Sequence, residues 1–250
     1  MTSKIMIEAK NISKHFERKI ALSSLSFSIQ QGELVALIGP SGAGKTTLLN
    51  SIAGIVPIQN GELIIDSKPI TSYKKGNVFA KKVGVIRQQF DLIGSIAVIH
   101  NVLAGRLADW GLFKSLLSLL VPQEKGMAFK ALEKVGLSDK MYEITSTLSG
   151  GEQQRVAMAR LMVQKPEVIL ADEPVASLDP ARAEDVLAMM ISIVAEEKQT
   201  LIASLHSVEY ARKYFKRIIA LKNGEILFDL PTEKVTDDLL ANLYRLKEQE

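Results

Sequence analysis

The sequence contains no cysteine and only three histidines, His15, His100 and His206. Disulfide bonds and thiolate metal sites are therefore excluded, and a metal site built from histidines is disfavoured. A chain without cysteine suits a reducing compartment. We therefore expect a cytosolic protein.

The sequence also lacks a block of charge of one sign. Its 31 Lys and Arg residues and 28 Asp and Glu residues give a formal net charge of +3. They are mixed along the chain, without the basic run or arginine-rich arm that is typical of nucleic-acid-binding proteins. The composition therefore predicts no nucleic-acid partner.

No hydrophobic run is long enough to suggest a membrane span, which needs roughly 20 largely uncharged residues. The most apolar later region, residues 96–121, is interrupted by polar and charged residues, namely His100, Asn101, Arg106, Asp109 and Lys114. Residues 1–10 carry Lys4 and Glu8 and do not form a signal peptide. We expect a protein that is not exported and whose link to any membrane comes through a partner.

Short apolar runs do occur, and they lack polar alternation, which indicates parallel strands covered on both faces. These runs are residues 34–38, 83–86, 168–171 and 201–205. Segments with helical spacing lie between them, at 45–53, 152–163 and 182–196. The alternation predicts an α/β fold built from βαβ units. With 47% hydrophobic residues in 250, the chain can bury the core of a single domain.

The edges of the predicted sheet have a different character. Shorter strands at 6–9, 25–29 and 63–66 indicate an antiparallel flank, and Asn223-Gly224 predicts a type I′ hairpin turn. Residues 89–160 are rich in Leu, Ala, Lys and Glu without a convincing strand. We therefore expect one domain over 1–250, in which a helical subdomain at about 89–160 is inserted between core segments 1–88 and 161–250.

Residues 39–47 carry the strongest pattern, Gly-Pro-Ser-Gly-Ala-Gly-Lys-Thr-Thr, between an apolar run and a helical segment. It matches a P-loop, in which glycines let backbone N–H groups turn toward phosphate oxygens. Lys45 is expected to reach the β- and γ-phosphates of ATP, and Thr46 to bind Mg²⁺. A flexible glycine-rich turn is the alternative. Such a turn would not need an apolar strand before it and a helix after it, whereas a P-loop has both. The predicted nucleotide-binding residues are Gly39, Pro40, Ser41, Gly42, Ala43, Gly44, Lys45, Thr46 and Thr47.

Two adjacent carboxylates, Asp172 and Glu173, follow the apolar run at 168–171. Ligands of open α/β sheets bind beyond the carboxyl ends of the strands. We therefore expect Asp172 to bind Mg²⁺ beside the P-loop and Glu173 to act on the attacking water. Alone, this pattern also fits a strand that simply meets solvent, and it is the P-loop that favours the catalytic interpretation.

Gln88 and His206 follow two further apolar runs. The neutral amide of Gln88 can contact Mg²⁺ or water, and His206 can bind the γ-phosphate or orient Glu173. Each signal is weak alone, because a histidine at a strand end is more often an ordinary surface residue and Gln88 beside Gln89 also fits a solvated loop. Their position relative to the P-loop makes both candidate catalytic residues.

Residues 148–155 read Leu-Ser-Gly-Gly-Glu-Gln-Gln-Arg and open another helical segment. Backbone N–H groups, the serine hydroxyl and the helix dipole together offer a second anion site. One nucleotide already has its phosphates held by residues 39–46. The second site therefore implies either a second ligand or a second copy of the protein, and the residues leave both open.

In chain order, these patterns resemble the motifs of ABC ATPases. Residues 39–47, Gln88, 148–153, 168–173, 177–179 and His206 are similar to the Walker A, Q-loop, signature, Walker B, D-loop and switch-histidine motifs. The resemblance covers nearly the whole chain and implies a RecA-like P-loop NTPase core that hydrolyses ATP with Mg²⁺. It also implies a head-to-tail dimer, in which one subunit completes the other's γ-phosphate site through Ser149, Gly150 and Gly151, with Asp179 at the seam.

The resemblance further places an aromatic ring against adenine, at a position where this chain has Phe16 and tyrosine is commoner. A buried core Phe is the alternative. Arg87 departs from the apolar or aromatic residue that usually precedes the Q-loop glutamine. Closer similarity to the phosphonate-import branch lies in residues 87–92, 107–110, 172–180 and 205–211, although Ser207 departs from the glutamine expected there.

The resemblance implies an importer ATPase at the cytoplasmic face of the membrane, with permease subunits, a second ATPase subunit and, indirectly, an extracytoplasmic solute-binding protein as partners. Phosphonate or a related phosphorus oxyanion is the expected solute, and another solute is the alternative. We place the permease-facing surface on the helical subdomain, near Phe90, Ile93, Ile96 and Trp110, where core packing is the alternative. A soluble ABC ATPase acting on DNA or the ribosome is the competing class, disfavoured by a single cassette without a basic linker. A small-molecule kinase would leave residues 148–153 without a role.

Overall fold

The computed structural model describes residues 4–17, 19–73, 77–87, 90–176 and 178–245. The chain forms two compact units. The first comprises Met1–Tyr73, Leu170–Glu173 and Lys198–Glu250, and the second comprises Lys74–Ile169 and Pro174–Glu197. The predicted single domain, with its helical subdomain at 89–160, stays a prediction.

Strands and helices alternate along much of the chain, as expected for an α/β fold. The strands are β1 (Ile5–Phe16), β2 (Lys19–Gln30), β3 (Leu34–Ile38), β4 (Asn60–Ile65), β5 (Lys68–Pro69), β6 (Val83–Ile86), β7 (Val168–Asp172), β8 (Thr200–Ser204), β9 (Arg217–Lys222) and β10 (Glu225–Pro231). The α-helices are α1 (Lys45–Ile52), α2 (Asn77–Ala80), α3 (Val98–Leu103), α4 (Leu112–Leu120), α5 (Lys125–Lys134), α6 (Gly150–Gln164), α7 (Pro180–Glu196), α8 (Val208–Tyr214) and α9 (Asp237–Tyr244). Within the described residues, no helix combines the length and apolar character needed to cross a bilayer.

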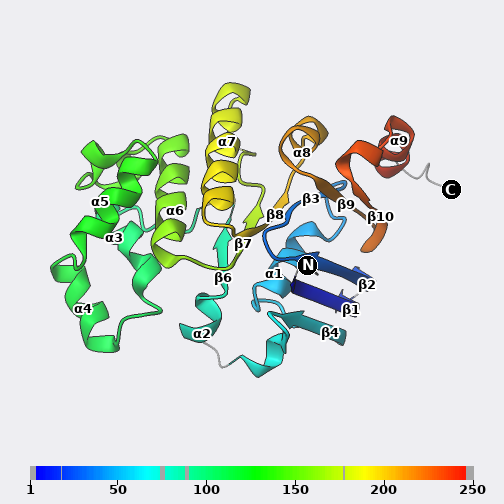
Figure 1. Cartoon of the computed structure of the whole chain (residues 1–250), viewed down its shortest axis with the longest axis horizontal. Coiled ribbons are helices and arrows are strands. Elements are labelled where there is room, and N and C mark those ends of the chain that lie inside the picture. The colour runs from blue at the N-terminus through cyan, green and yellow to red at the C-terminus, as the bar shows by residue number, and fades with distance from the viewer. Residues whose placement is uncertain (1–3, 18, 74–76, 88–89, 177, 246–250) are drawn as a thin grey trace. The chain divides into compact units, whose positions relative to one another are not determined.

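In the first unit, an antiparallel sheet has the strand order β2-β1-β4-β5 (Figure 1). Ile7 of β1 pairs with Ile29 of β2 and with Ile65 of β4. All three side chains are buried, because alternate residues of neighbouring strands share one face of the sheet. The predicted antiparallel flank is confirmed, although β1 and β2 are longer than the predicted strands at 6–9 and 25–29.

The first unit also contains most of a second sheet. Within this unit, the strands of that sheet follow the order β10-β9-β3-β8-β7. β3 pairs in parallel with both β8 and β9. Every residue of β8 is buried, which explains why its sequence is apolar without alternation. Asn223 and Gly224 join β9 to β10 with φ angles of 54° and 80°, so the predicted hairpin is confirmed.

The second unit is mainly helical, and α3, α5 and α6 lie side by side in it (Figure 1). Their contacts are apolar, with Val102, Leu132 and Val156 fully buried. The backbone of Gly105, which follows α3, lies close to the backbone of α6. A Cβ on Gly105 would lie 2.4 Å from the carbonyl oxygen of Arg160. β6 borders β7 in this unit, where the backbone N–H of Val168 donates to the carbonyl of Lys82.

Two aromatic residues that we expected at a permease surface belong instead to the core of the second unit. Phe90 and Trp110 are only 6% and 5% exposed. The indole Nε1 of Trp110 donates to Oε1 of Glu124 at 3.3 Å, which satisfies its polar group as burial requires. Ile93, which is 57% exposed, remains available as a surface residue.

Candidate nucleotide site

The P-loop connects β3 to α1 in a conformation that requires glycine. Gly39, Gly42 and Gly44 have φ angles of 148°, 79° and 106°. A Cβ on Gly39 would lie 2.1 Å from the carbonyl oxygen of Leu221, and one on Gly44 would lie 2.4 Å from that of Ala21. Both the backbone angles and the close neighbours therefore exclude larger residues. The loop wraps tightly at the start of α1, as an anion-binding turn must.

Lys45, the first residue of α1, is almost completely buried, with 4% of its surface exposed. Its Nζ donates to the carbonyl oxygen of Gly39 at 2.7 Å and to that of Pro40 at 3.2 Å. Burial lowers the pKa of the ammonium group, whereas the charges of Glu173 and Asp172 oppose that shift. The loop therefore holds its cation in place through its own carbonyl groups.

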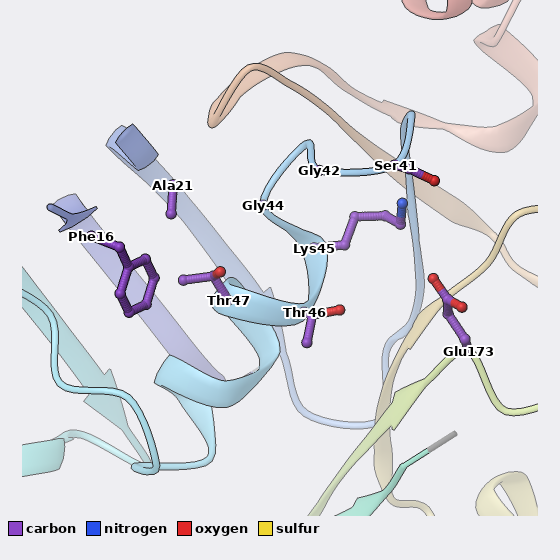
Figure 2. Close-up of a pocket in the computed structure, with 9 residues that line it drawn as sticks. All are labelled: Phe16, Ala21, Ser41, Gly42, Gly44, Lys45, Thr46, Thr47 and Glu173. Carbon is purple, nitrogen blue, oxygen red and sulfur yellow. The ribbon is translucent and has the colours of Figure 1, made fainter. Parts of the chain in front are cut away.

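A pocket of about 270 Å³ opens beside this loop. Its lining residues are Phe16, Ala21, Ser41, Gly42, Gly44, Lys45, Thr46, Thr47 and Glu173. Figure 2 shows Phe16 at one side of the start of α1 and Glu173 at the other. Phe16 is 46% exposed, so it is not the buried core residue that was the alternative. Its exposed ring face suits the stacking of a planar base.

Asp172 ends β7 beside two hydroxyl groups. Oγ of Ser204 donates to Oδ1 of Asp172 at 2.7 Å, and Oγ1 of Thr46 donates to the same oxygen at 3.3 Å. A hydroxyl and a carboxylate are oxygen ligands of the kind that Mg²⁺ takes. The pair therefore fits the Mg²⁺ site predicted for Thr46 and Asp172, which stays a prediction.

Glu173 and His206 meet at the same edge of the sheet. Oε1 of Glu173 and Nε2 of His206 lie 2.5 Å apart, within hydrogen-bonding distance. Glu173 has a φ of 49°, a conformation that few residues other than glycine adopt and that is enriched at functional sites. Its carboxylate lines the pocket, and its contact with His206 can fix the orientation that a general base requires.

The glycine-rich segment at 148–153 starts α6 in the second unit. Ser149 is the N-cap: its Oγ accepts from the backbone N–H of Glu152 at 3.4 Å, while Oε2 of Glu152 accepts from the N–H of Ser149 at 2.8 Å. This reciprocal capping box fixes the helix start. Ser149 and Gly150 are exposed and Gly151 is buried. Their predicted role at a partner's γ-phosphate stays a prediction.

Asp179 caps α7 in the same unit. Its Oδ1 accepts from the backbone N–H of Arg182 at 3.1 Å, and the residue is exposed. This capping contact is a sufficient structural reason for an aspartate at the start of a helix. Its expected place at a dimer seam therefore stays a prediction.

Comparison with known proteins decides the family. A sequence profile described as ABC transporter matches residues 22–176, more than half of the chain. The chain belongs to the ABC transporter family. As a cassette of this family, it binds ATP and hydrolyses it.

Two relatives of the chain within the ABC transporter family are named for transport of the same solute class. "Phosphonates import ATP-binding protein PhnC 1" of Nostoc sp. is 43% identical over 98% of this chain and 94% of that protein. The protein of the same name from Halalkalibacterium halodurans is 40% identical over 98% of this chain and 97% of that protein. These matches span the whole cassette.

Solved ABC cassettes share the fold. The dimeric structure of MJ0796, a bacterial ABC transporter cassette, matches with a TM-score of 0.78 and 29% identity over 91% of this chain and 99% of that chain. The ADP conformation of MJ1267, another cassette, matches with a TM-score of 0.81 and 26% identity over 96% of this chain and 95% of that chain. The predicted P-loop NTPase fold is thereby confirmed.

The structure of this ABC cassette brings together, in the first unit, Lys45, Thr46, Asp172, Glu173 and His206. Phe16 and parts of the P-loop line the same pocket. Gln88, predicted as a catalytic and Mg²⁺-binding residue, lies outside the described residues. The roles of the individual residues stay predictions.

Ser204 is a residue of the site that the sequence did not indicate. Its Oγ donates to Asp172 and accepts from the backbone N–H of Glu173 at 2.8 Å, so one hydroxyl positions both acids. Ser204 ends the buried strand β8 and is itself fully buried. A serine inside the apolar run at 201–205, two residues before His206, was the only available signal.

We expect Ser204→Ala to lower kcat for ATP hydrolysis roughly tenfold, because a hydrogen bond to a charged group contributes about 1.5 kcal/mol and 1.4 kcal/mol corresponds to a factor of ten. Steady-state phosphate release measures this change. Ser26→Ala, at an exposed serine of β2, is the matched control and should leave kcat unchanged. An unaltered kcat in Ser204→Ala would show that the acids keep their positions without this hydroxyl.

Proposed function

We propose that the chain is the ATP-hydrolysing subunit of an importer for phosphonates or a related phosphorus oxyanion. The observation that carries this proposal is identity of 43% and 40%, over 98% of the chain, to proteins named as phosphonates import ATP-binding proteins. The chain's partners are then permease subunits, which cross the membrane, and a solute-binding protein outside the cell that acts through them. The chain itself attaches to the cytoplasmic side of the membrane.

In this proposal the residues of the first unit have separate functions in binding and hydrolysing ATP. Phe16 stacks on the adenine, and Lys45 neutralises the β- and γ-phosphates from its place against the P-loop carbonyls. Thr46, Asp172 and Gln88 would hold Mg²⁺, which would supply positive charge to neutralise the phosphate oxygens. Glu173 accepts the proton of the attacking water, and His206 orients its carboxylate.

A second copy of the chain completes the site in the proposed head-to-tail homodimer. Ser149, Gly150 and Gly151 of that copy approach the γ-phosphate, and Asp179 lies at the seam. Support comes from the exposure of Ser149 and Gly150 at the start of α6, where the helix dipole favours an anion. Support also comes from the solved cassette MJ0796, whose structure is described as dimeric and bound to ADP and Pi.

The solute is tested with the complete transporter reconstituted in liposomes with its permease and solute-binding protein. We expect methylphosphonate or 2-aminoethylphosphonate to stimulate ATP hydrolysis, with sulfate and glycine as controls that do not. The same assay with a Glu173→Gln cassette shows whether the stimulated activity belongs to this chain. Stimulation by an unrelated solute alone would contradict the phosphonate assignment, and co-sedimentation with ribosomes or DNA instead of membranes would contradict the transporter role.

A further inference from the structure

The C-terminal helix α9 is fastened to the first unit at both ends. At its start, Nη2 of Arg212 donates to the carbonyl of Val235 and to Oδ1 of Asp237, both at 2.8 Å. At its end, Nζ of Lys222 donates to the carbonyl of Asn242 at 2.5 Å and to a second carbonyl one turn on, at 3.1 Å. A cation at the carboxyl end of a helix satisfies carbonyls that have no partner within the helix. These contacts fix the axial position of α9.

The same Lys222 belongs to the hairpin that rests on the P-loop. It ends β9, and the turn that follows contributes the backbone N–H of Gly224, which donates to the carbonyl of Ala43 at 3.1 Å. Leu221, the preceding residue, presents its carbonyl oxygen to Gly39 so closely that no Cβ would fit between them. The end of β9 therefore touches the P-loop on one side and α9 on the other.

Tyr244, the last residue of α9, lies between the two residues whose carbonyls Lys222 binds. Burial raises the pKa of its phenol, and a backbone interaction with Gly39 opposes that rise. The carbonyl of Gly39 in turn accepts from the ammonium group of Lys45. The backbone of Gly39 thus lies between the carbonyl of Leu221, which precedes Lys222, and the nucleotide-binding cation.

We propose that α9 positions the P-loop for ATP through Lys222, the positioning residue that joins the carboxyl end of α9 to the hairpin resting on the P-loop. The side chain of Lys222 does not line the pocket, so its effect passes through the neighbouring Leu221 and the hairpin turn. Asp172, Glu173 and His206 stand on β7 and after β8, and no contact described for α9 involves them. Positioning of the P-loop by α9 therefore changes the affinity for ATP and leaves the rate of the hydrolytic step unchanged. It goes beyond the proposed function, because it does not depend on the solute or the permease.

The test compares Lys222→Met, which removes only the cation, and Lys222→Gln, which keeps a polar but uncharged side chain. We expect each to raise the Kd for MgATP, measured by isothermal titration calorimetry on the full chain, by roughly 2- to 10-fold, as for loss of one hydrogen bond. Lys222→Arg keeps a cationic donor and should restore affinity. The control Asn242→Ala changes an exposed side chain of α9 and keeps the carbonyl that Lys222 binds. At saturating ATP, kcat should stay at the wild-type value in all of them.

Thermal unfolding without nucleotide separates positioning from stability. A lower melting temperature with unchanged Kd would reduce α9 to a structural brace and overturn the proposal. So would a fall in kcat at unchanged Kd. Because Lys222→Gln keeps a polar side chain, it tests the idea even if Lys222→Met fails to fold. A wild-type chain that binds no MgATP would instead contradict the function of the cassette.

Discussion

Replacing Glu173 by glutamine is expected to lower the rate of ATP hydrolysis by roughly 10²- to 10⁴-fold, the range typical of a lost general base. The amide keeps the shape of the carboxylate but cannot accept the proton of the attacking water. Its contact with His206 survives, because an amide oxygen still accepts a hydrogen bond. ATP affinity should therefore stay close to that of the wild type.

Two measurements check this prediction. Single-turnover hydrolysis gives the rate of the chemical step, and size-exclusion chromatography with MgATP reports whether an ATP-bound dimer accumulates. His206→Ala is the informative companion variant, since it removes the group that orients Glu173 and keeps the base. Full hydrolysis by the Glu173→Gln chain would mean that another group activates the water.

Replacing Lys45 by alanine is expected to weaken ATP binding by roughly 10- to 100-fold, since hydrogen bonds to charged groups contribute about 1.5–3 kcal/mol. The loss has a second part. Without the ammonium group, the carbonyl oxygens of Gly39 and Pro40 lose their donor at a buried position. The free energy of unfolding should therefore fall as well, by about 1–3 kcal/mol for a buried unsatisfied group.

Isothermal titration with MgATP and thermal unfolding without nucleotide measure the two parts separately. Lys130→Ala is a suitable control, because that lysine of α5 is exposed and does not line the pocket. Wild-type affinity in Lys45→Ala would remove Lys45 from the nucleotide site. Reduced stability with normal affinity would make it a structural lysine.

Much of the site followed from the sequence because its residues come at the ends of recognisable elements. The P-loop pattern fixes Lys45 and Thr46 within one short segment, and the acids close an apolar strand. Parallel strands bring such ends together whatever the length of chain between them. That is why Asp172 and Thr46 were expected near each other, and their oxygens lie 3.3 Å apart.

Other features depend on register and packing, which no local pattern encodes. Ser204 reads as part of an apolar strand, and only its place beside Asp172 gives it a role. Lys222 and Asn242 are 20 residues apart, and the hydrogen bond between them requires the final helix to dock. Phe90 and Trp110 have the composition of a docking surface and turned out to be core, because apolar residues look alike until neighbours cover them.

The capping box that opens α6 has an electrostatic consequence. Hydrogen bonds from Lys140 and from Ser149 lower the pKa of Glu152 to about 2. A carboxylate with a depressed pKa stabilises the fold above its ordinary pKa of 4.5 and loses that contribution only as the pH falls toward 2. This helix start therefore keeps its negative charge at mildly acidic pH. Mild acid does not remove the charge of Glu152, and regulation of the cassette by acidity would have to act at another group.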